Sequence, residues 1–286
     1  MKSRTAILAR TKATVTGNQL VNISHPRLFG MNLNGLHKLR KIVRNAPNLL
    51  HGLNISVDAD KLRLIDYVYE SIVPNADSFA DLGGVWKVNG AYSLHTLRKH
   101  RLANGTIVDT DFSTRLRQRL EQTSRLRVVV GDFSRQDIIK TLGTVDVAYF
   151  FDVLLHQANP SWDQVLSAYA SVSSCFVVYN QQYVGDEHSI RLTHLPLDQY
   201  LKMTPSSGEQ VSRSAYEHAT ELHPVYQKPW LDIHNIFQWA ITDRDLCDVM
   251  GRLGYHQVHY CNHGRFSNLR MYENHAFVFV RNQAVN

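Results

Sequence analysis

Acidic residues follow four short apolar runs along this chain, and glycines follow the first acid. In the segment SFADLGGVWKVNG, Asp81 precedes Gly83 and Gly84, whose missing side chains would let a ligand approach the backbone. A helix expected to start near Gly90 would direct its free N–H groups toward a polar part of that ligand. An acid at the tip of a second strand can accept hydrogen bonds from ribose hydroxyls, so the layout predicts a nucleotide-like ligand. The later acids are Asp109, Asp111, Asp132 and Asp152.

Short apolar runs rich in Val, Ile and Phe alternate with helical patterns through the middle of the chain. Such runs are typical of strands buried on both faces of a parallel sheet, which binds its ligand at the carboxyl ends of the strands. Near the C-terminus, YHQVHYCN and HAFVFVRN predict an antiparallel hairpin. The sequence therefore predicts an α/β fold with a Rossmann-like, doubly wound sheet. The predicted parallel strands cover residues 78–82, 105–109, 126–130, 145–151 and 175–179.

Two of the connecting helices carry capping signals. Asn159 and Pro160 predict the N-cap and the first turn of the helix that follows the fourth strand. Thr242, with Asp245 three residues later, predicts the start of a late helix that ends at Gly254.

Residues 60–282 resemble the class I S-adenosylmethionine-dependent methyltransferases, because these motifs occur in the order typical of that family. The resemblance implies a seven-stranded, mostly parallel sheet with an antiparallel terminal hairpin, and S-adenosyl-L-methionine as cofactor. Asp81 with Gly83 and Gly84 resembles the motif that contacts the methionine part. Asp111, with Asp109 as the other acid at that strand end, resembles the ribose-binding acid.

Two further segments extend the resemblance. Asp132 and Phe133 are similar to the family's adenine-binding motif, in which the acid takes the adenine amino group and the apolar residue packs on the ring. The segment 145–157 resembles the fourth strand, whose end, at Asp152, is expected to face the departing methyl group.

The first motif departs from the family's pattern. The family places glycines two, four and six residues after the acid, and here Val85 and Lys87 occupy the last two positions. One alternative is a nucleotide-dependent oxidoreductase of similar fold, but its loop would need G-x-G-x-x-G. The other is a non-catalytic S-adenosylmethionine-binding or scaffold protein, which the acids at all three cofactor positions disfavour.

His156 is the expected general base. Methyl transfer to a hydroxyl or carboxyl group needs the acceptor in line with the methyl carbon and sulfur, and a group that takes one proton. His156 directly follows the fourth strand, and its ordinary pKa suits proton removal near neutral pH. The alternative is that it orients a loop or caps the next helix. The expected reaction is methyl transfer to an oxygen of a small-molecule acceptor.

A long insertion, at about 181–230, lies where a compact sheet would need only one crossover. In this fold such insertions build the acceptor pocket, and Arg191 could clamp a carboxylate or phosphate. The segment HNIFQWAI that follows predicts an amphipathic scaffold helix. No standard zinc spacing occurs among the histidines, so no metal is predicted, although Asp152 with His156 forms a partial site. The residues expected to contact the acceptor are Tyr183, His188, Arg191 and His234.

Residues 1–57 form a basic arm. Nine Lys and Arg residues precede the first acid, Asp58, so the net charge of +6 leaves −3 on residues 58–286. Helical spacing at Leu36, Leu39 and Ile42 predicts a helical cap over the active site. A targeting leader, a membrane-surface contact and a nucleic-acid contact are alternatives. The last is disfavoured, because the remaining chain lacks a basic stripe interleaved with aromatics.

Size and composition predict one enzyme-sized domain plus an extension, and the resemblance implies a class I methyltransferase domain over residues 58–286. At 44% apolar residues the chain can bury a large core, and no apolar run approaches the 18 residues of a membrane span. Cys175, Cys247 and Cys261 lack close-pair spacing and predict reduced thiols in a cytoplasmic protein. A small-molecule acceptor is the expected partner, and a homodimer is left open.

Overall fold

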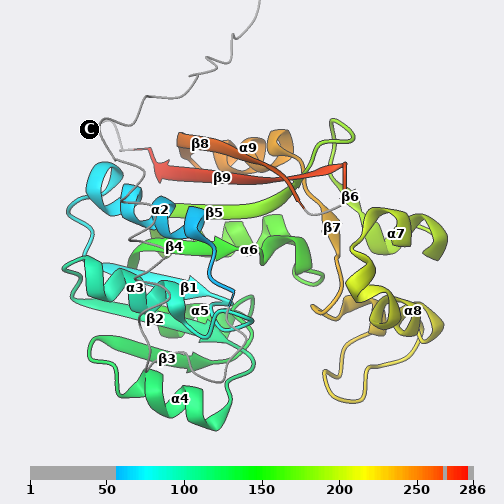
Figure 1. The fold of residues 1–286 in the computed structure, drawn as a ribbon, viewed down its shortest axis with the longest axis horizontal. Coiled ribbons are helices and arrows are strands. Elements are labelled where there is room, and N and C mark those ends of the chain that lie inside the picture. Colours follow the sequence, from blue (N-terminus) through cyan, green and yellow to red (C-terminus); the bar gives the residue numbers. More distant parts are fainter. Residues whose placement is uncertain (1–55, 267–268, 283–286) are drawn as a thin grey trace, which may run out of the picture. The chain divides into compact units, whose positions relative to one another are not determined.

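The computed structural model describes residues 56–266 and 269–282, which form a seven-stranded sheet with helices on both faces (Figure 1). The strand order is β3-β2-β1-β4-β5-β9-β8, and β9 alone runs opposite to the other six. This order confirms the doubly wound, mostly parallel sheet with a terminal antiparallel hairpin. The strands are β1 (Ser78–Leu82), β2 (Asn104–Asp109), β3 (Leu126–Val130), β4 (Val145–Phe151), β5 (Ser173–Tyr183), β8 (Tyr255–Arg265) and β9 (Tyr272–Arg281).

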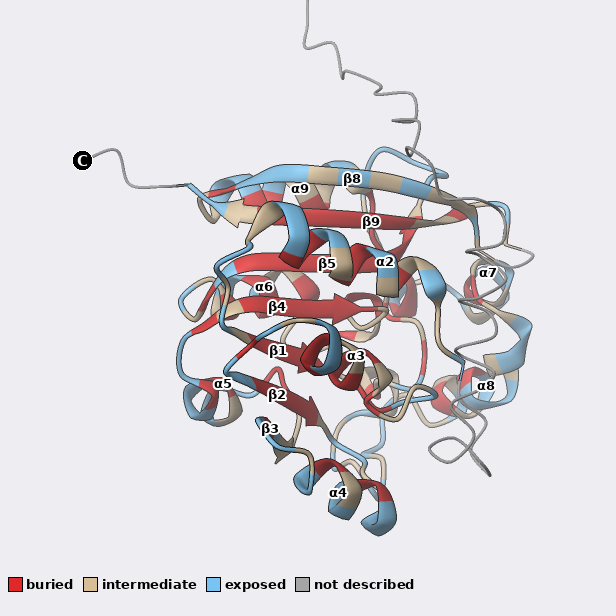
Figure 2. Cartoon of the chain, turned by 60° about the vertical axis from the view of Figure 1, so that its left-hand side comes forward, coloured by how far each residue is buried: buried red, intermediate tan, exposed pale blue. Residues whose placement is uncertain are grey.

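Two apolar cores lie on opposite faces of this sheet, since successive side chains of a buried strand alternate between faces. Phe150 and Val178 pack with one set of helices, and Tyr149 and Val177 pack with the other. The central strands are buried along their length (Figure 2). The first face carries α5 (Gln136–Leu142), α6 (Trp162–Tyr169) and α9 (Asp243–Arg252), and the second carries α2 (Ala59–Tyr67), α3 (Ala91–Lys99) and α4 (Thr114–Glu121).

The helix ends confirm one capping prediction and correct the other. The Thr242 hydroxyl accepts a hydrogen bond from the Asp245 amide (3.2 Å) at the start of α9, as predicted. Helix α6 begins at Trp162, with Ser161 and Gln164 forming its capping box, so Asn159 is not the cap. Ser161 is the N-cap because its backbone amide donates a hydrogen bond to the side-chain oxygen of Gln164, three residues later.

The segment between β5 and α9 folds into a small lobe with its own apolar core. Ile233, Ile236 and Ala240 are buried there, as the amphipathic pattern of HNIFQWAI required. The predicted helix is wrong, however, because Trp239 and Ala240 form β7 and pair with β6 instead. The lobe lies beyond the carboxyl ends of β1 and β4 (Figure 1). Its elements are β6 (Ile190–Arg191), α7 (Leu197–Met203), α8 (Glu209–Glu217) and β7 (Trp239–Ala240).

The described residues begin after the basic arm. The predicted cap helix around residues 36–43, like the whole basic arm up to residue 55, lies outside the described residues. Within the part of the chain that the structure describes, no helix is both long and apolar enough to cross a membrane.

Candidate cofactor and acceptor site

The acids identified in the sequence meet at the carboxyl edge of the sheet. Asp81 lies near the end of β1, in register with Ile107 of β2 and Tyr149 of β4, and Asp109 ends β2. Asp132 and Asp152 follow the ends of β3 and β4. Because these strands are parallel neighbours, the four acids share one edge.

Asp81 lies beneath the glycine turn. Its carboxylate is 1% exposed and accepts a hydrogen bond from the Ser93 hydroxyl (2.6 Å), and burial raises its pKa to about 6. A Cβ on Gly84 would lie 2.5 Å from that carboxyl group, and Gly83 adopts φ +75°. Only glycine fits either position, so Asp81 supports the turn from below.

The loop after the turn replaces the missing glycines with an unusual backbone. Lys87 and Asn89 have φ of 56° and 49°, and Gly90 follows with φ 73° as the N-cap of α3. The Val85 amide donates to Asp109 Oδ2 (2.9 Å), which ties the loop to β2. Although Val85 and Lys87 replace two glycines, the loop ends at the helix start that was expected near Gly90.

Asp109 and Asp111 differ in position. Asp109 is partly buried, and its other oxygen accepts from the amides of Thr110 (2.7 Å) and Asp111 (3.3 Å). Burial raises the pKa of Asp109 against the lowering effect of these hydrogen bonds. Asp111 is exposed beyond the strand end. Asp109 is thus fixed at the strand tip by backbone amides, and Asp111 lies two residues beyond it.

Asp132 bonds to residues from two parts of the chain. One oxygen accepts from the amide (3.0 Å) and hydroxyl (2.6 Å) of Ser134, and the other accepts from Lys228 Nζ of the insertion (2.9 Å). Burial opposes ionisation, but these hydrogen bonds hold the pKa of Asp132 below its usual value. Phe133 is buried beside the glycine turn, 3.7 Å from where a Gly83 Cβ would lie.

The insertion also brings His234 to this edge. Burial lowers the pKa of His234, while the charges of Asp132 and Asp109 raise it, so the imidazole lies within electrostatic range of both acids. Its ring contacts that of Tyr226 at 5.0 Å between centroids. The Lys228–Asp132 bond thus places this part of the chain at the acid that follows β3.

His156 ends a single 3-10 turn, Leu154–His156, directly after β4. Its Nδ1 lies 2.9 Å from the Ile236 carbonyl oxygen, which can only accept, so Nδ1 carries the proton and Nε2 the lone pair. Burial lowers the pKa of His156, so the ring is neutral near pH 7. Phe237 holds the ring edge-on at 5.3 Å between centroids.

Sequence reasoning missed the partner of Asp152. Lys61 of α2, 91 positions earlier in the chain, is buried and forms an ion pair with the partly exposed Asp152, whose second oxygen accepts from Gln181 Nε2 (2.6 Å). A signal was present, since Lys61 shares the spacing of Leu64 and Ile65, which form the buried face of the helix.

The structure separates the other predicted acceptor-binding residues. Arg191 is engaged internally, because its guanidinium donates to the Ala158 carbonyl (2.9 Å) and to Asp232 (3.2 Å). His188 is 69% exposed near the start of α9, where it pairs with Asp245. Tyr183 lies at the end of β5, with its ring 5.7 Å from that of Tyr272. Of these three, Tyr183 is the one at a carboxyl strand end within the sheet.

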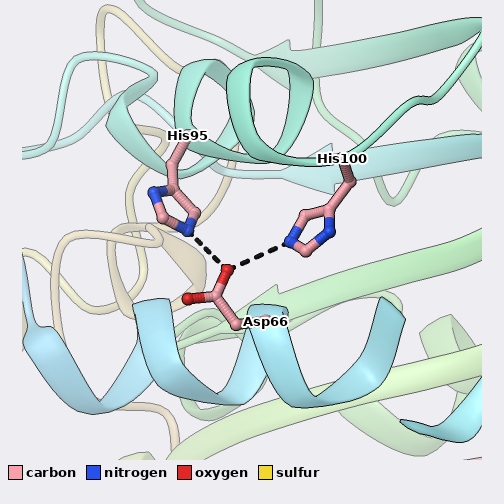
Figure 3. Close-up of side chains that lie close together, drawn as sticks. All are labelled: Asp66, His95 and His100. Atoms are coloured by element: carbon pink, nitrogen blue, oxygen red, sulfur yellow. Dashed lines mark hydrogen bonds and ion pairs between the residues drawn. The ribbon is translucent and has the colours of Figure 1, made fainter. Parts of the chain in front are cut away.

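A second cluster of polar groups joins α2 to α3. His95 and His100 bring their Nε2 atoms to Asp66 Oδ1 at 2.8 and 3.0 Å (Figure 3). These three ligand-type groups have a spacing that could hold a metal ion. Lys99 Nζ, however, lies 2.8 Å from Asp66 Oδ2 and already neutralises the carboxylate. We interpret the cluster as a clasp between two helices.

Comparison with solved structures identifies the architecture. The N-terminal domain of EvdMO1, solved with S-adenosylhomocysteine bound, matches 86% of this chain and 97% of its own at a TM-score of 0.52 and 16% identity. The chain has the class I methyltransferase fold. No family model and no curated protein matches it.

Two further solved structures match at lower scores. An O-methyltransferase family protein from Burkholderia thailandensis is 13% identical, with 78% of this chain matched at a TM-score of 0.47. This chain spans 56% of that protein. The 1,6-didemethyltoxoflavin N1-methyltransferase of the same organism is 11% identical over 87% of this chain and 85% of its own, at a TM-score of 0.49.

Proposed function

We propose that this protein is an S-adenosylmethionine-dependent methyltransferase that acts on an oxygen of a small-molecule acceptor. The observation that carries the proposal is the gathering of Asp81, Asp109 and Asp132 with a glycine turn at one edge of a sheet with the class I strand order. Two glycines leave the backbone open, and Asp109 and Asp132 supply acceptors for ribose hydroxyls and an adenine amino group. The residues present fit the cofactor.

Residues of the chain would position the acceptor and take up one proton. The bound cofactor supplies a methyl group activated on a sulfonium. His156 Nε2 takes the proton of the acceptor hydroxyl, while Nδ1–H stays on the Ile236 carbonyl and keeps the ring oriented. Lys228 attaches the insertion to Asp132 at the cofactor edge, where it would limit the access of water to the bound cofactor.

The alternatives fit these observations less well. A dinucleotide-dependent oxidoreductase would need free loop amides for a pyrophosphate, yet the Val85 amide is bound to Asp109. A non-catalytic scaffold would have no need for a neutral, oriented histidine beside the fourth strand. Ligand binding tests the oxidoreductase, and methyl uptake by acceptors tests the non-catalytic scaffold.

Isothermal calorimetry with S-adenosylhomocysteine tests the proposal. We expect Asp109→Ala to weaken binding by about 1.5–3 kcal/mol, the usual contribution of hydrogen bonds to a charged group. Asp111→Ala is the matched control two residues away, expected to change binding by under about 0.5 kcal/mol. A larger loss with Asp111→Ala would reassign the ribose contact to that residue. Binding of a nicotinamide dinucleotide in place of S-adenosylhomocysteine would contradict the proposal.

A small-molecule acceptor and a cytoplasmic location belong to the same proposal. Residues 58–286 carry a net charge of −3, which disfavours a polyanionic partner for the domain. The three cysteines are free, and Cys175 is buried in β5, consistent with a reducing compartment.

A further inference from the structure

A buried lysine stands at the edge of the sheet where the cofactor is proposed to bind. Lys61 lies in the first turn of α2, and its side chain is only 8% exposed. Its Nζ forms an ion pair with Asp152, which directly follows β4. Lysine is rarely this buried, so its position calls for a physical reason.

Three aromatic rings surround the Lys61 ammonium. Nζ lies 4.8 Å from the ring centroid of Tyr179, 5.8 Å from that of Tyr92 and 5.9 Å from that of Phe151. An ammonium carries three N–H donors, and Asp152 is the one hydrogen-bond acceptor it meets among the described residues. The enclosed ammonium therefore keeps donors for a ligand.

The backbone of Asp152 also has an uncommon conformation. Its backbone has φ +56°, a left-handed conformation that non-glycine residues rarely adopt. Its amide donates to the Tyr179 carbonyl (2.8 Å), and Gln181 donates to its carboxylate. Apolar replacements of a buried ion pair are often neutral or stabilising, so stability alone does not explain this arrangement. Strained residues that surroundings hold in place cluster at functional sites.

The groups of the glycine turn are already bonded within the protein, so other groups must bind the methionine part of the cofactor. In the resemblance, the first motif contacts the methionine part of the cofactor. Here the Asp81 carboxylate is enclosed below the turn with Ser93, and the Val85 amide is bound to Asp109. Val153, the residue after Asp152, lies 2.6 Å from where a Gly83 Cβ would be, so Asp152 adjoins the turn.

The geometry points to the Lys61–Asp152 pair as the receptor for the zwitterionic amino-acid end of the cofactor. Lys61 would bind the α-carboxylate, and Asp152 the α-ammonium. Two opposite charges, one on a buried lysine and one on a partly exposed aspartate, match two opposite charges on the ligand, and neither partner is left unpaired. The inference rests on the proposed function, because it assumes that this cofactor binds.

The test compares two ligands that differ in the amino-acid end. S-adenosylhomocysteine carries it, whereas 5′-methylthioadenosine keeps the adenosine and the sulfur but lacks it. By calorimetry, Lys61→Met should weaken S-adenosylhomocysteine about 10- to 100-fold and change 5′-methylthioadenosine less than about twofold. Methionine retains the packing of the stem among the rings without the charge. Lys61→Arg should recover part of the lost affinity.

Lys228→Met is the matched control, since Lys228 pairs with Asp132 at the same edge. It should affect both ligands equally. Equal loss of both ligands in Lys61→Met, or no loss of either, would overturn the assignment, because Lys61 would then support the fold or do nothing. Wild-type protein that binds neither ligand would overturn the proposed function itself, and this inference with it.

Discussion

The hydrogen bond between His156 and the Ile236 carbonyl decides which ring nitrogen could act as a base. Nδ1 must donate there, so Nε2 is the free acceptor, and burial lowers the pKa so that the neutral ring prevails. Ile236 lies in the segment that follows the insertion, so the orientation of the base depends on a residue 80 positions away in the chain.

Replacement of His156 tests this role. His156→Ala should lower turnover by about 10²- to 10⁴-fold and leave S-adenosylhomocysteine affinity near its native value, because a general base acts in the transition state. His156→Gln should be nearly as inactive, since an amide cannot take the proton. The assay is methyl uptake by a panel of hydroxylated and carboxylated metabolites. Full activity of His156→Ala would mean that another base is used or that none is needed.

At the scale of elements, the α2–α3 clasp positions the helix that carries Lys61. Asp66 accepts from His95, His100 and Lys99, all of α3 or its end. Burial works against ionisation, but the hydrogen bonds from His95 and Lys99 hold the pKa of Asp66 at about 2. The carboxylate therefore stabilises the contact between helices as long as it is ionised.

Asp66→Asn should lower the free energy of unfolding by about 1 kcal/mol at neutral pH, a value reduced for solvent screening. The folded pKa is depressed, so this contribution is fully present above the unfolded value near 4 and is lost as pH falls toward 2. Urea unfolding at pH 7, 5 and 3 measures it. Glu70→Gln is the control, because Glu70 contacts Lys99 but neither histidine. A difference between Asp66→Asn and wild type that did not shrink at pH 3 would refute the linkage.

The insertion is the second element that shapes the site. Side chains of the insertion bind the loops that follow β3 and β4: Lys228 pairs with Asp132, and Arg191 donates to the Ala158 carbonyl. Arg191 thus serves to attach the insertion, where the sequence indicated an anion clamp.

At the scale of the whole molecule, charge separates the arm from the domain. Residues 1–57 contain nine positive and no negative side chains, and residues 58–286 carry a net charge of −3. If the acceptor is a small molecule, mobility-shift titrations of the full chain with RNA and DNA at about 150 mM salt should show only weak association that weakens steeply with added salt. The same protein without residues 1–55 isolates the contribution of the arm. Tight association at that salt would contradict the small-molecule acceptor.

Local patterns in the sequence determined the sheet and the acids at its edge. Apolar runs such as residues 145–151 are buried on both faces, and each acid lies at the end of its strand or within two residues after it, so strand prediction also located Asp109, Asp132 and Asp152. The terminal hairpin followed from alternation for the same reason. These features depend on neighbours within a few positions.

Tertiary structure alone decided which groups meet. Lys61 pairs with Asp152 across 91 residues and Lys228 with Asp132 across 96, and no local pattern encodes either distance. HNIFQWAI has helical spacing, yet pairing of β7 with β6 satisfies its backbone and buries the same residues. Periodicity records which side chains are buried, whereas the partners that bury them are set by the packing of segments far apart in the chain.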